Sequence, residues 1–353
     1  MNIDYRDLTN GQRAIAVQRL TALWAFTESG LGGIMHAFQF PFTGLLVGGM
    51  AVVMICLIAE IAAHNFRQIL TSAVIVLIVK AMVSPHTPFP AYIAVSFQAF
   101  IGYGLFRLLG VNFVSILLLS TLAMIESAIQ KILILTLFYG DSLWKAMDNM
   151  VDFLTSQFNI APVNGSYWLV GIYLLLYFIG GILIAWLSYR SIKTLYAGNE
   201  MQGLGKIQFA CPELIPLNSR NKNNKQKLWI MIVFVIALSV VLFLFAPNVK
   251  QGWLAVTRTV IWTTSAILVW YVLISPLFTK LIKQVLKKKE SKYSGEVLKV
   301  LSFLPVLRQL AAAAWKLSKD RGGLRRWHLF ITLLIHWSLI YSDTNSLEIS
   351  PQP

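Results

Sequence analysis

Residues 43–63 read TGLLVGGMAVVMICLIAEIAA, an apolar run in which Glu60 is the one ionisable side chain. A helix of about 20 apolar residues is long enough to cross the hydrocarbon core of a bilayer. A strand of a membrane barrel would instead alternate apolar and polar residues, and this run does not. The stretch therefore predicts a transmembrane helix.

The same pattern recurs along the chain, which has 353 residues, 57% of them hydrophobic and 13% charged. Soluble domains are about 45–50% apolar and about 25% charged. The predicted fold is therefore all-α, a polytopic helical membrane protein. Nine candidate spans follow from the apolar runs: 21–40, 43–63, 67–84, 90–109, 113–138, 167–190, 228–246, 253–280 and 325–342.

These spans form two groups separated by a polar segment. Residues 1–193 hold six spans and predict a six-helix membrane module. Residues 194–227 are rich in Gly, Asn and Lys and predict a basic cytoplasmic linker. Residues 228–353 predict a smaller membrane module with two or three further spans and an amphipathic cytoplasmic arm at about 295–321.

The formal net charge of +15 is concentrated in two segments. Residues 191–227 hold six Lys and Arg, and residues 280–326 hold thirteen. Basic loops between apolar spans usually mark the cytoplasmic face. The charge therefore predicts topology and contact with membrane lipids, and no nucleic-acid partner. We expect a multi-pass protein of the cell (cytoplasmic or inner) membrane with its N-terminus in the cytoplasm.

The basic arm has its own pattern. Apolar residues recur there at helical spacing, Pro305 is expected to start or kink the helix, and Gly322 and Gly323 are expected to end it. The arm would either lie on anionic headgroups or dock another protein. Four cations decorate its remaining surface: Lys299, Arg308, Lys316 and Lys319.

Common catalytic signatures are absent from the sequence. It contains no Walker A pattern, no His-Glu-x-x-His and no Gly-x-Ser-x-Gly. Its two cysteines make no metal or redox spacing. We therefore predict no enzymatic activity, no catalytic residues, no cofactor and no metal site.

Ionisable residues at bilayer depth are costly and usually functional. Glu126 and Gln130 are four apart and share a helix face, which predicts either a site for a polar small molecule or a pair that fixes helix packing. Lys131 would neutralise a carboxylate of a neighbouring helix. The ionisable candidates within the spans are Glu28, His36, Lys80, Glu126 and Lys131.

Residues 84–90 read SPHTPFP and connect two spans on the outer face. Prolines fix φ, so the connector is stiff. It is either a tight turn or a cap over an outward-facing pocket, with His86 as its titratable group. The other edge of that pocket would be residues 140–165, which contain Trp144.

Small residues at i and i+4 allow close helix contact, inside the protein or with a partner subunit. Two such pairs occur, Gly33 with Ala37 and Gly44 with Gly48.

Three features together resemble the substrate-binding S component of energy-coupling factor (ECF) vitamin transporters. They are the six spans over residues 14–193, SPHTPFPAYIAVSFQ at 84–98, and AMIESAIQK at 123–131. The second half resembles part of the T component of that family. LPVLRQLAAAAWKLSKDRGG at 304–323 resembles its coupling helix, although a second copy is missing.

The resemblance implies uptake of a vitamin-like nutrient, with ATP hydrolysed by separate ABC ATPase subunits. Gly33 and Ala37 would meet a T component, and Arg308 and Arg321 would belong to the coupling helix. The implied substrate-binding residues are His86, Tyr92, Gln98, Glu126, Gln130 and Trp144.

Two other functions stay open from the sequence. The chain would be an integral-membrane enzyme acting on lipid or isoprenoid if Glu126, Asp141, Asp148 and Asp152 served as its acids. It would be a noncatalytic membrane scaffold subunit if the basic arm mattered and the intramembrane polar groups did not.

Overall fold

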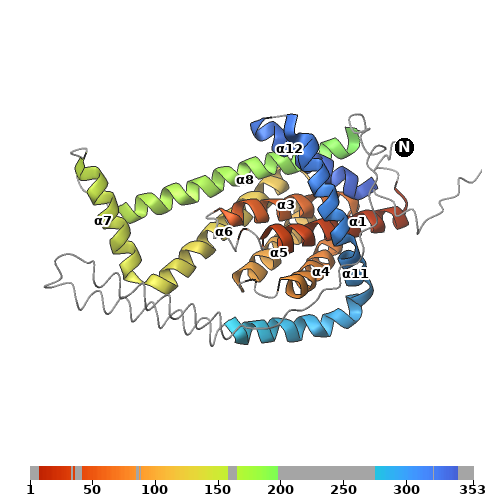
Figure 1. Ribbon diagram of the computed structural model, residues 1–353, viewed down its shortest axis with the longest axis horizontal. Helices are drawn as coiled ribbons and strands as arrows, with labels where there is room; N and C mark the ends of the chain where they lie inside the picture. Colours follow the sequence, from red (N-terminus) through yellow and green to blue (C-terminus); the bar gives the residue numbers. More distant parts are fainter. Residues whose placement is uncertain are drawn as a thin grey trace, which may run out of the picture. The chain divides into compact units, whose positions relative to one another are not determined.

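The computed structural model describes residues 8–32, 35, 42–84, 87, 89–157, 165–197, 275–320 and 322–340. All regular secondary structure in these residues is helical, which confirms the predicted all-α fold (Figure 1). The predicted span at 228–246, most of that at 253–280 and most of the predicted linker lie outside the described residues.

Helices occupy the other predicted spans, and apart from the span 21–40 their ends agree within a few residues except at α8, which continues to Ala197 where the predicted end was 190. The predicted span 21–40 is described as helix only in its first half, where α1 continues directly into the π-helical segment η1. The bounds are α1 Asn10–Phe26, η1 Thr27–Leu31, α3 Thr43–Ile61, α4 Arg67–Val83, α5 Pro90–Leu109, α6 Phe113–Tyr139, α8 Gly165–Ala197 and α12 Gly323–Ile340.

Among the described helices, five are long and apolar enough to cross a membrane, and α12 is not one of them: α3, α5, α6, Gly165–Thr194 of α8 and Tyr293–Leu317 of the basic arm. With 17 residues, α4 is at the lower limit of the roughly 17–25 that a span needs. The protein is therefore a multi-pass helical membrane protein. The arm was predicted as amphipathic rather than spanning, because its cations interrupt the apolar run.

The chain divides into two compact units. The first comprises Met1–Lys131, Val170–Pro212 and Phe278–Pro353, and the second comprises Ile132–Leu169 and Glu213–Leu277. Helices α6 and α8 each contribute to both units.

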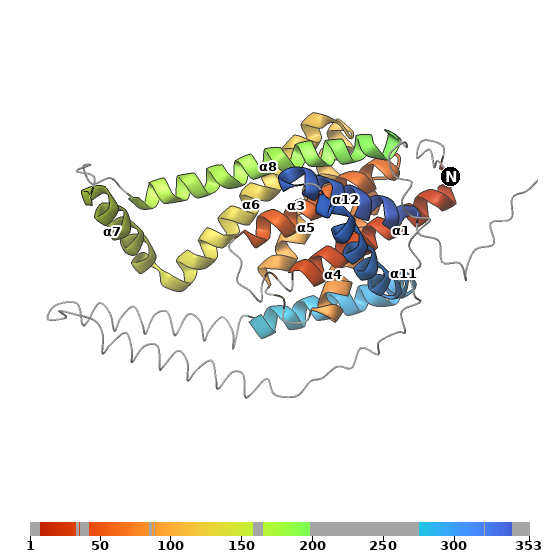
Figure 2. The same cartoon turned by 45° about the horizontal axis from the view of Figure 1, so that its top comes forward.

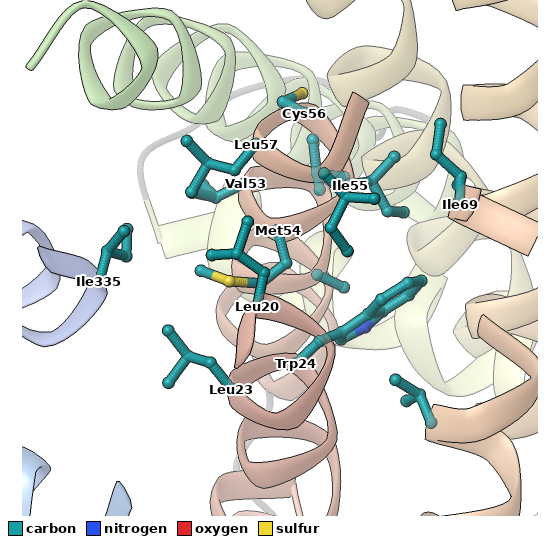
Figure 3. Close-up of a cluster of buried hydrophobic side chains, with 14 of the residues drawn as sticks. Leu20, Leu23, Trp24, Val53, Met54, Ile55, Cys56, Leu57, Ile69 and Ile335 are labelled. Carbon is teal, nitrogen blue, oxygen red and sulfur yellow. The ribbon is translucent and has the colours of Figure 1, made fainter. Parts of the chain in front are cut away.

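Helix α3 is the centre of the first unit. It is apolar around its whole circumference, and such a helix is stable where neighbours cover every face. It packs against α1, α4 and α5, and α12 covers α1 from another direction (Figure 2). Figure 3 shows Leu20 and Trp24 of α1 beside Met54 of α3, with Ile335 of α12 in the same cluster.

Glycines let these helices approach closely. A Cβ on Gly102 would lie 2.8 Å from Ile55 Cγ2, and one on Gly49 would lie 2.6 Å from Ile184 Cδ1. Close contact of this kind drives helix association where lipid is as apolar as the side chains. The predicted pair Gly44 and Gly48 faces side chains of the same chain, so its close contact is inside the protein.

Arg19 of α1 holds the C-terminus of α12. Its Nη1 donates to Leu339 O at 2.9 Å and lies 3.5 Å from Ser338 O. The last carbonyls of a helix have no partner within the helix, and a basic side chain there satisfies them and complements the helix dipole.

The basic arm is the C-terminal part of a long helix, α11, Ser275–Leu317. Pro305 lies inside this helix and does not start it. A 3-10 turn, Ser318–Asp320, ends it, and Gly323, one of the predicted pair, takes a positive φ of 58° as the first residue of α12. The predicted apolar stripe is buried in the core of the first unit at Val300, Leu307, Leu310 and Ala314.

The second unit contains a helix that the sequence did not predict, α7, Asp141–Gln157. None of its residues is buried. Asp148 Oδ1 accepts a hydrogen bond from the Ser166 backbone N–H at 2.7 Å, in the first turn of α8. A carboxylate there satisfies an unpaired donor and complements the positive end of the helix dipole.

Candidate functional site

A buried ion pair joins two helices of the first unit. Lys80 Nζ lies 2.6 Å from Glu28 Oε2, and the two side chains are 3% and 4% exposed. An isolated charge at such a position would be strongly unfavourable, so each charge requires the other. The predicted partner for a carboxylate was Lys131, but Lys131 is exposed and pairs with no described carboxylate. The buried cation that pairs with a carboxylate of a neighbouring helix is Lys80.

Glu28 reaches this position from η1, the π-helical segment. One turn of π-helix widens the helix and is frequent at functional sites. The hydroxyls of Thr27 and Ser29 donate to the carbonyls of Trp24 and Ala25 at 2.8 and 2.6 Å. These bonds give backbone carbonyls around the widened turn additional partners within the buried helix.

Lys80 also faces the start of α5. Its Nζ lies 3.5 Å from Ala91 O and 5.8 Å from the centre of the Tyr92 ring. The ammonium group therefore connects α1, α4 and α5 at one place. Tyr92, a predicted substrate contact, lies beside this ion pair.

Helix α6 contributes the next polar groups. Gln130 Nε2 donates to Pro90 O at 3.0 Å, and Leu119 lies against Gly102, so one face of α6 looks toward α5. Glu126 is seven residues from Leu119 and four from Gln130, and shares that face. Its Oε2 is buried without a hydrogen-bond partner in the described residues.

Gln98 of α5 lies one turn before Gly102 and is 1% exposed. Its Nε2 would be 3.0 Å from a Cβ on Gly48, so the glycine leaves room for the amide. Its Oε1 is buried with no hydrogen-bond partner among the described residues. A buried acceptor without a partner is costly, and few occur in a native protein.

Two tyrosines of α8 extend this set, and the sequence analysis missed both. The rings of Tyr173 and Tyr177 are 4.9 Å apart, and the Tyr173 hydroxyl is buried. A Cβ on Gly44 would lie 3.7 Å from Tyr177 OH and 3.1 Å from Ser127 Cβ. Their spacing of four residues in an apolar run was the available signal.

The predicted substrate-binding residues therefore fall into three groups: those in the first unit, one in the second unit, and one outside the described residues. Tyr92, Gln98, Glu126 and Gln130 all belong to the first unit, on α5 and α6. Trp144 lies on α7 in the second unit. Outside the described residues lie His86 of the predicted cap, together with His36, Gly33, Ala37 and Arg321.

Arg308, a predicted subunit contact, is exposed on α11. In the part of the chain that the structure describes, no group of three or more His, Cys, Asp or Glu could hold a metal ion.

Comparison with known proteins adds no relative, because no protein family, curated protein or solved structure matches this chain. The chain is a multi-pass helical membrane protein with uncommon polar groups in its interior, and its function has to be argued from those groups.

Proposed function

We propose that this protein is a membrane transport protein, the substrate-binding or permease subunit for uptake of a small polar nutrient. The observation that carries the proposal is the pair of buried acceptor oxygens, Gln98 Oε1 and Glu126 Oε2, on two membrane helices. Polar groups within spans are expensive and mark substrate pathways by default.

The chemistry of these groups fits a ligand with hydrogen-bond donors. A carboxylate oxygen and an amide oxygen both accept hydrogen bonds, and no described cation forms an ion pair with Glu126. The nearby ammonium of Lys80 is already held by Glu28. The ion pair therefore serves as a fixed wall of the site, and Glu126 and Gln98 are left to recognise the ligand.

The resemblance to ECF transporters supplies the finer part of the proposal. The six-helix module at residues 1–193 would act as the S component and bind a vitamin-like molecule from outside. A T component and ABC ATPases would supply the energy. Arg308 on the exposed side of α11 is available for contact with those subunits.

The test is gentle affinity purification of the full chain from native membranes, followed by mass spectrometry of bound small molecules and proteins. We expect a donor-bearing small molecule with the wild type, and its loss in Gln98→Ala/Glu126→Ala. The matched control is Lys131→Ala, an exposed neighbour on the same helix, which should retain the molecule.

Equal elution profiles in size-exclusion chromatography would show that all variants stay folded. The proposal fails if the wild type carries no small molecule, or if the double variant retains it as well as the control does. A membrane complex bound through α11, unaffected by the double variant, would favour the scaffold alternative.

The enzyme alternative gains no support from the position of its acids. Glu126 lies on α6 in the first unit, whereas Asp141, Asp148 and Asp152 lie on α7 in the second. Asp148 is already engaged by the Ser166 N–H.

A further inference from the structure

Away from the ion pair, cations of the first unit stack on aromatic rings. Besides Arg19 on Phe303, the described pairs are Arg107 on Tyr103 at 5.8 Å, Arg190 on Trp186 at 5.2 Å, Lys193 on Tyr189 at 4.6 Å and Arg326 on Trp315 at 4.1 Å. We call the eight residues of these last four pairs the basic-aromatic end. Such contacts hold a cation in place without neutralising it.

Ring contacts show that the pairs belong to one end of the unit. Phe113 at the start of α6 lies 5.4 Å from Tyr189 near the end of α8. Trp186 of α8 lies 6.3 Å from His328 near the start of α12. Residues 110–112 connect Phe113 to the C-terminal end of α5, and that end carries Arg107. The ends of α5 and α8 and the starts of α6 and α12 therefore meet.

The connection between α11 and α12 brings further aromatic surface to this end. The rings of Trp315 and Trp327 are 5.3 Å apart, and both side chains are exposed. Lys316 and Arg325, beside these tryptophans, are exposed as well. Exposed Trp together with Lys and Arg at the ends of apolar helices is the composition of a membrane–water interface.

The charge at this end is not compensated. None of the four stacked cations forms an ion pair with a described residue. Arg326 Nε is buried and has no described hydrogen-bond partner, and Arg326 Cζ lies 4.1 Å from the centre of the Trp315 ring. A guanidinium whose face is stacked still presents its N–H edge, and that edge matches the oxygens of a phosphate group.

We infer that the basic-aromatic end binds the phosphate headgroups of anionic phospholipids in the adjacent leaflet. Arg107, Arg190 and Lys193 sit near the ends of helices that are apolar enough to span, and Arg326 lies over Trp315 near the end of another, so we place all four cations at headgroup depth. Lipid phosphates occupy the same depth along the whole rim, and an anionic leaflet attracts clustered Lys and Arg. This inference does not depend on the proposed transport function.

The experiment uses the full chain in bilayer nanodiscs made from equal amounts of phosphatidylglycerol and phosphatidylcholine. After mild detergent extraction and purification, the retained lipids are quantified by mass spectrometry. We expect several-fold enrichment of phosphatidylglycerol over phosphatidylcholine with the wild type. Arg190→Gln/Arg326→Gln should lose most of that enrichment.

The matched control is Lys299→Gln/Arg308→Gln, which removes two exposed cations of α11 outside the basic-aromatic end. It changes the net charge equally and should leave the enrichment unchanged. Arg326→Lys keeps the charge but loses the planar fork and the stacking, so its enrichment should be intermediate. Size-exclusion chromatography and circular dichroism check that every variant is folded.

Three results would overturn the inference. The first is no enrichment in the wild type, and the second is equal loss in the two Gln double variants, which would mean a net-charge effect without a built site. The third is an acidic protein that co-purifies through Arg190 and Arg326 while phosphatidylglycerol is not enriched.

Discussion

A lysine lies near each end of the first unit, and the two differ in burial and in partner. Lys80 is buried and lies 2.6 Å from a carboxylate, whereas Lys193 is exposed and lies over the ring of Tyr189 at 4.6 Å. A charge in a dry interior needs a countercharge, because desolvation is severe there. At the surface water solvates the ammonium group, and the aliphatic stem needs only an apolar neighbour.

This difference fits the two proposed roles, recognition of a small molecule at one end and contact with lipid headgroups at the other. The ion pair fixes the helices around Tyr92, Gln98 and Glu126, where a small molecule would be recognised by individual hydrogen bonds. The basic-aromatic end leaves its cations unneutralised over a broad rim, which suits many weak contacts with headgroups. The first role requires rigid geometry, and the second requires charge density.

The largest expected effect comes from breaking the ion pair. Lys80→Met should lower the free energy of unfolding by about 3–5 kcal/mol, because Glu28 would stay buried without a partner. Lys193→Met, the same substitution at the other end, should change it by less than about 0.5 kcal/mol. Thermal unfolding in one detergent compares the two.

The control for this prediction is Glu28→Gln/Lys80→Met, which removes both charges and should recover most of the lost stability. Equal destabilisation by Lys80→Met and Lys193→Met would contradict the contrast between the two ends.

A smaller loss of stability is expected when the close packing of α8 against α6 is disturbed. A Cβ on Gly181 of α8 would lie 2.9 Å from Thr121 Cα, a backbone atom that cannot move aside, so Gly181→Ala should cost about 1–3 kcal/mol. Gly171 on the same helix has no atom within 4 Å of such a Cβ, and Gly171→Ala should be neutral or stabilising by up to about 1 kcal/mol. Similar unfolding temperatures for the two variants would show that α6 and α8 are not in tight contact.

The smallest effect concerns a hydroxyl between two helices. Thr21 Oγ1 lies 2.7 Å from Ser72 Oγ and 2.7 Å from Val17 O. Thr21→Val keeps the shape and should cost about 0.6 kcal/mol, as interhelical hydrogen bonds in membranes do on average.

Thr194→Val is the counterpart near the basic-aromatic end, where the exposed hydroxyl bonds only to Arg190 O of its own helix. We expect no measurable change in unfolding temperature from it. A loss as large as that of Thr21→Val would mean that the hydroxyl itself, rather than its interhelical bond, sets the cost.

The helices were predictable because local chemistry decides where they begin and end. Residues 90–109 were predicted as a span, and α5 is Pro90–Leu109. Pro90 suits a first helical turn, and Gly110 ends the helix with a positive φ of 71°. Helix α7 was missed because its aspartates interrupt the apolar positions, although Trp144, Met147 and Val151 recur at helical spacing.

The site was predictable only in part. Glu28 and Lys80 stood out in the sequence as charges within apolar runs, but 52 residues separate them. Their pairing depends on how α1 packs against α4 and on a π-helical turn that no local pattern indicated. Tyr173 and Tyr177 were missed because their proximity to the other polar groups depends on how α8 packs.

The bond from Arg19 to the Leu339 carbonyl spans 320 residues and has a consequence for biosynthesis. At about 5–20 residues per second, a ribosome needs on the order of tens of seconds to make the intervening chain. We expect α1 to enter the membrane early in synthesis and to contact α12 only after nearly the whole chain has been made. A premature stop codon upstream of Gly323 would therefore remove α12 and leave a fragment with an uncovered first helix, an expected substrate for membrane quality-control proteases.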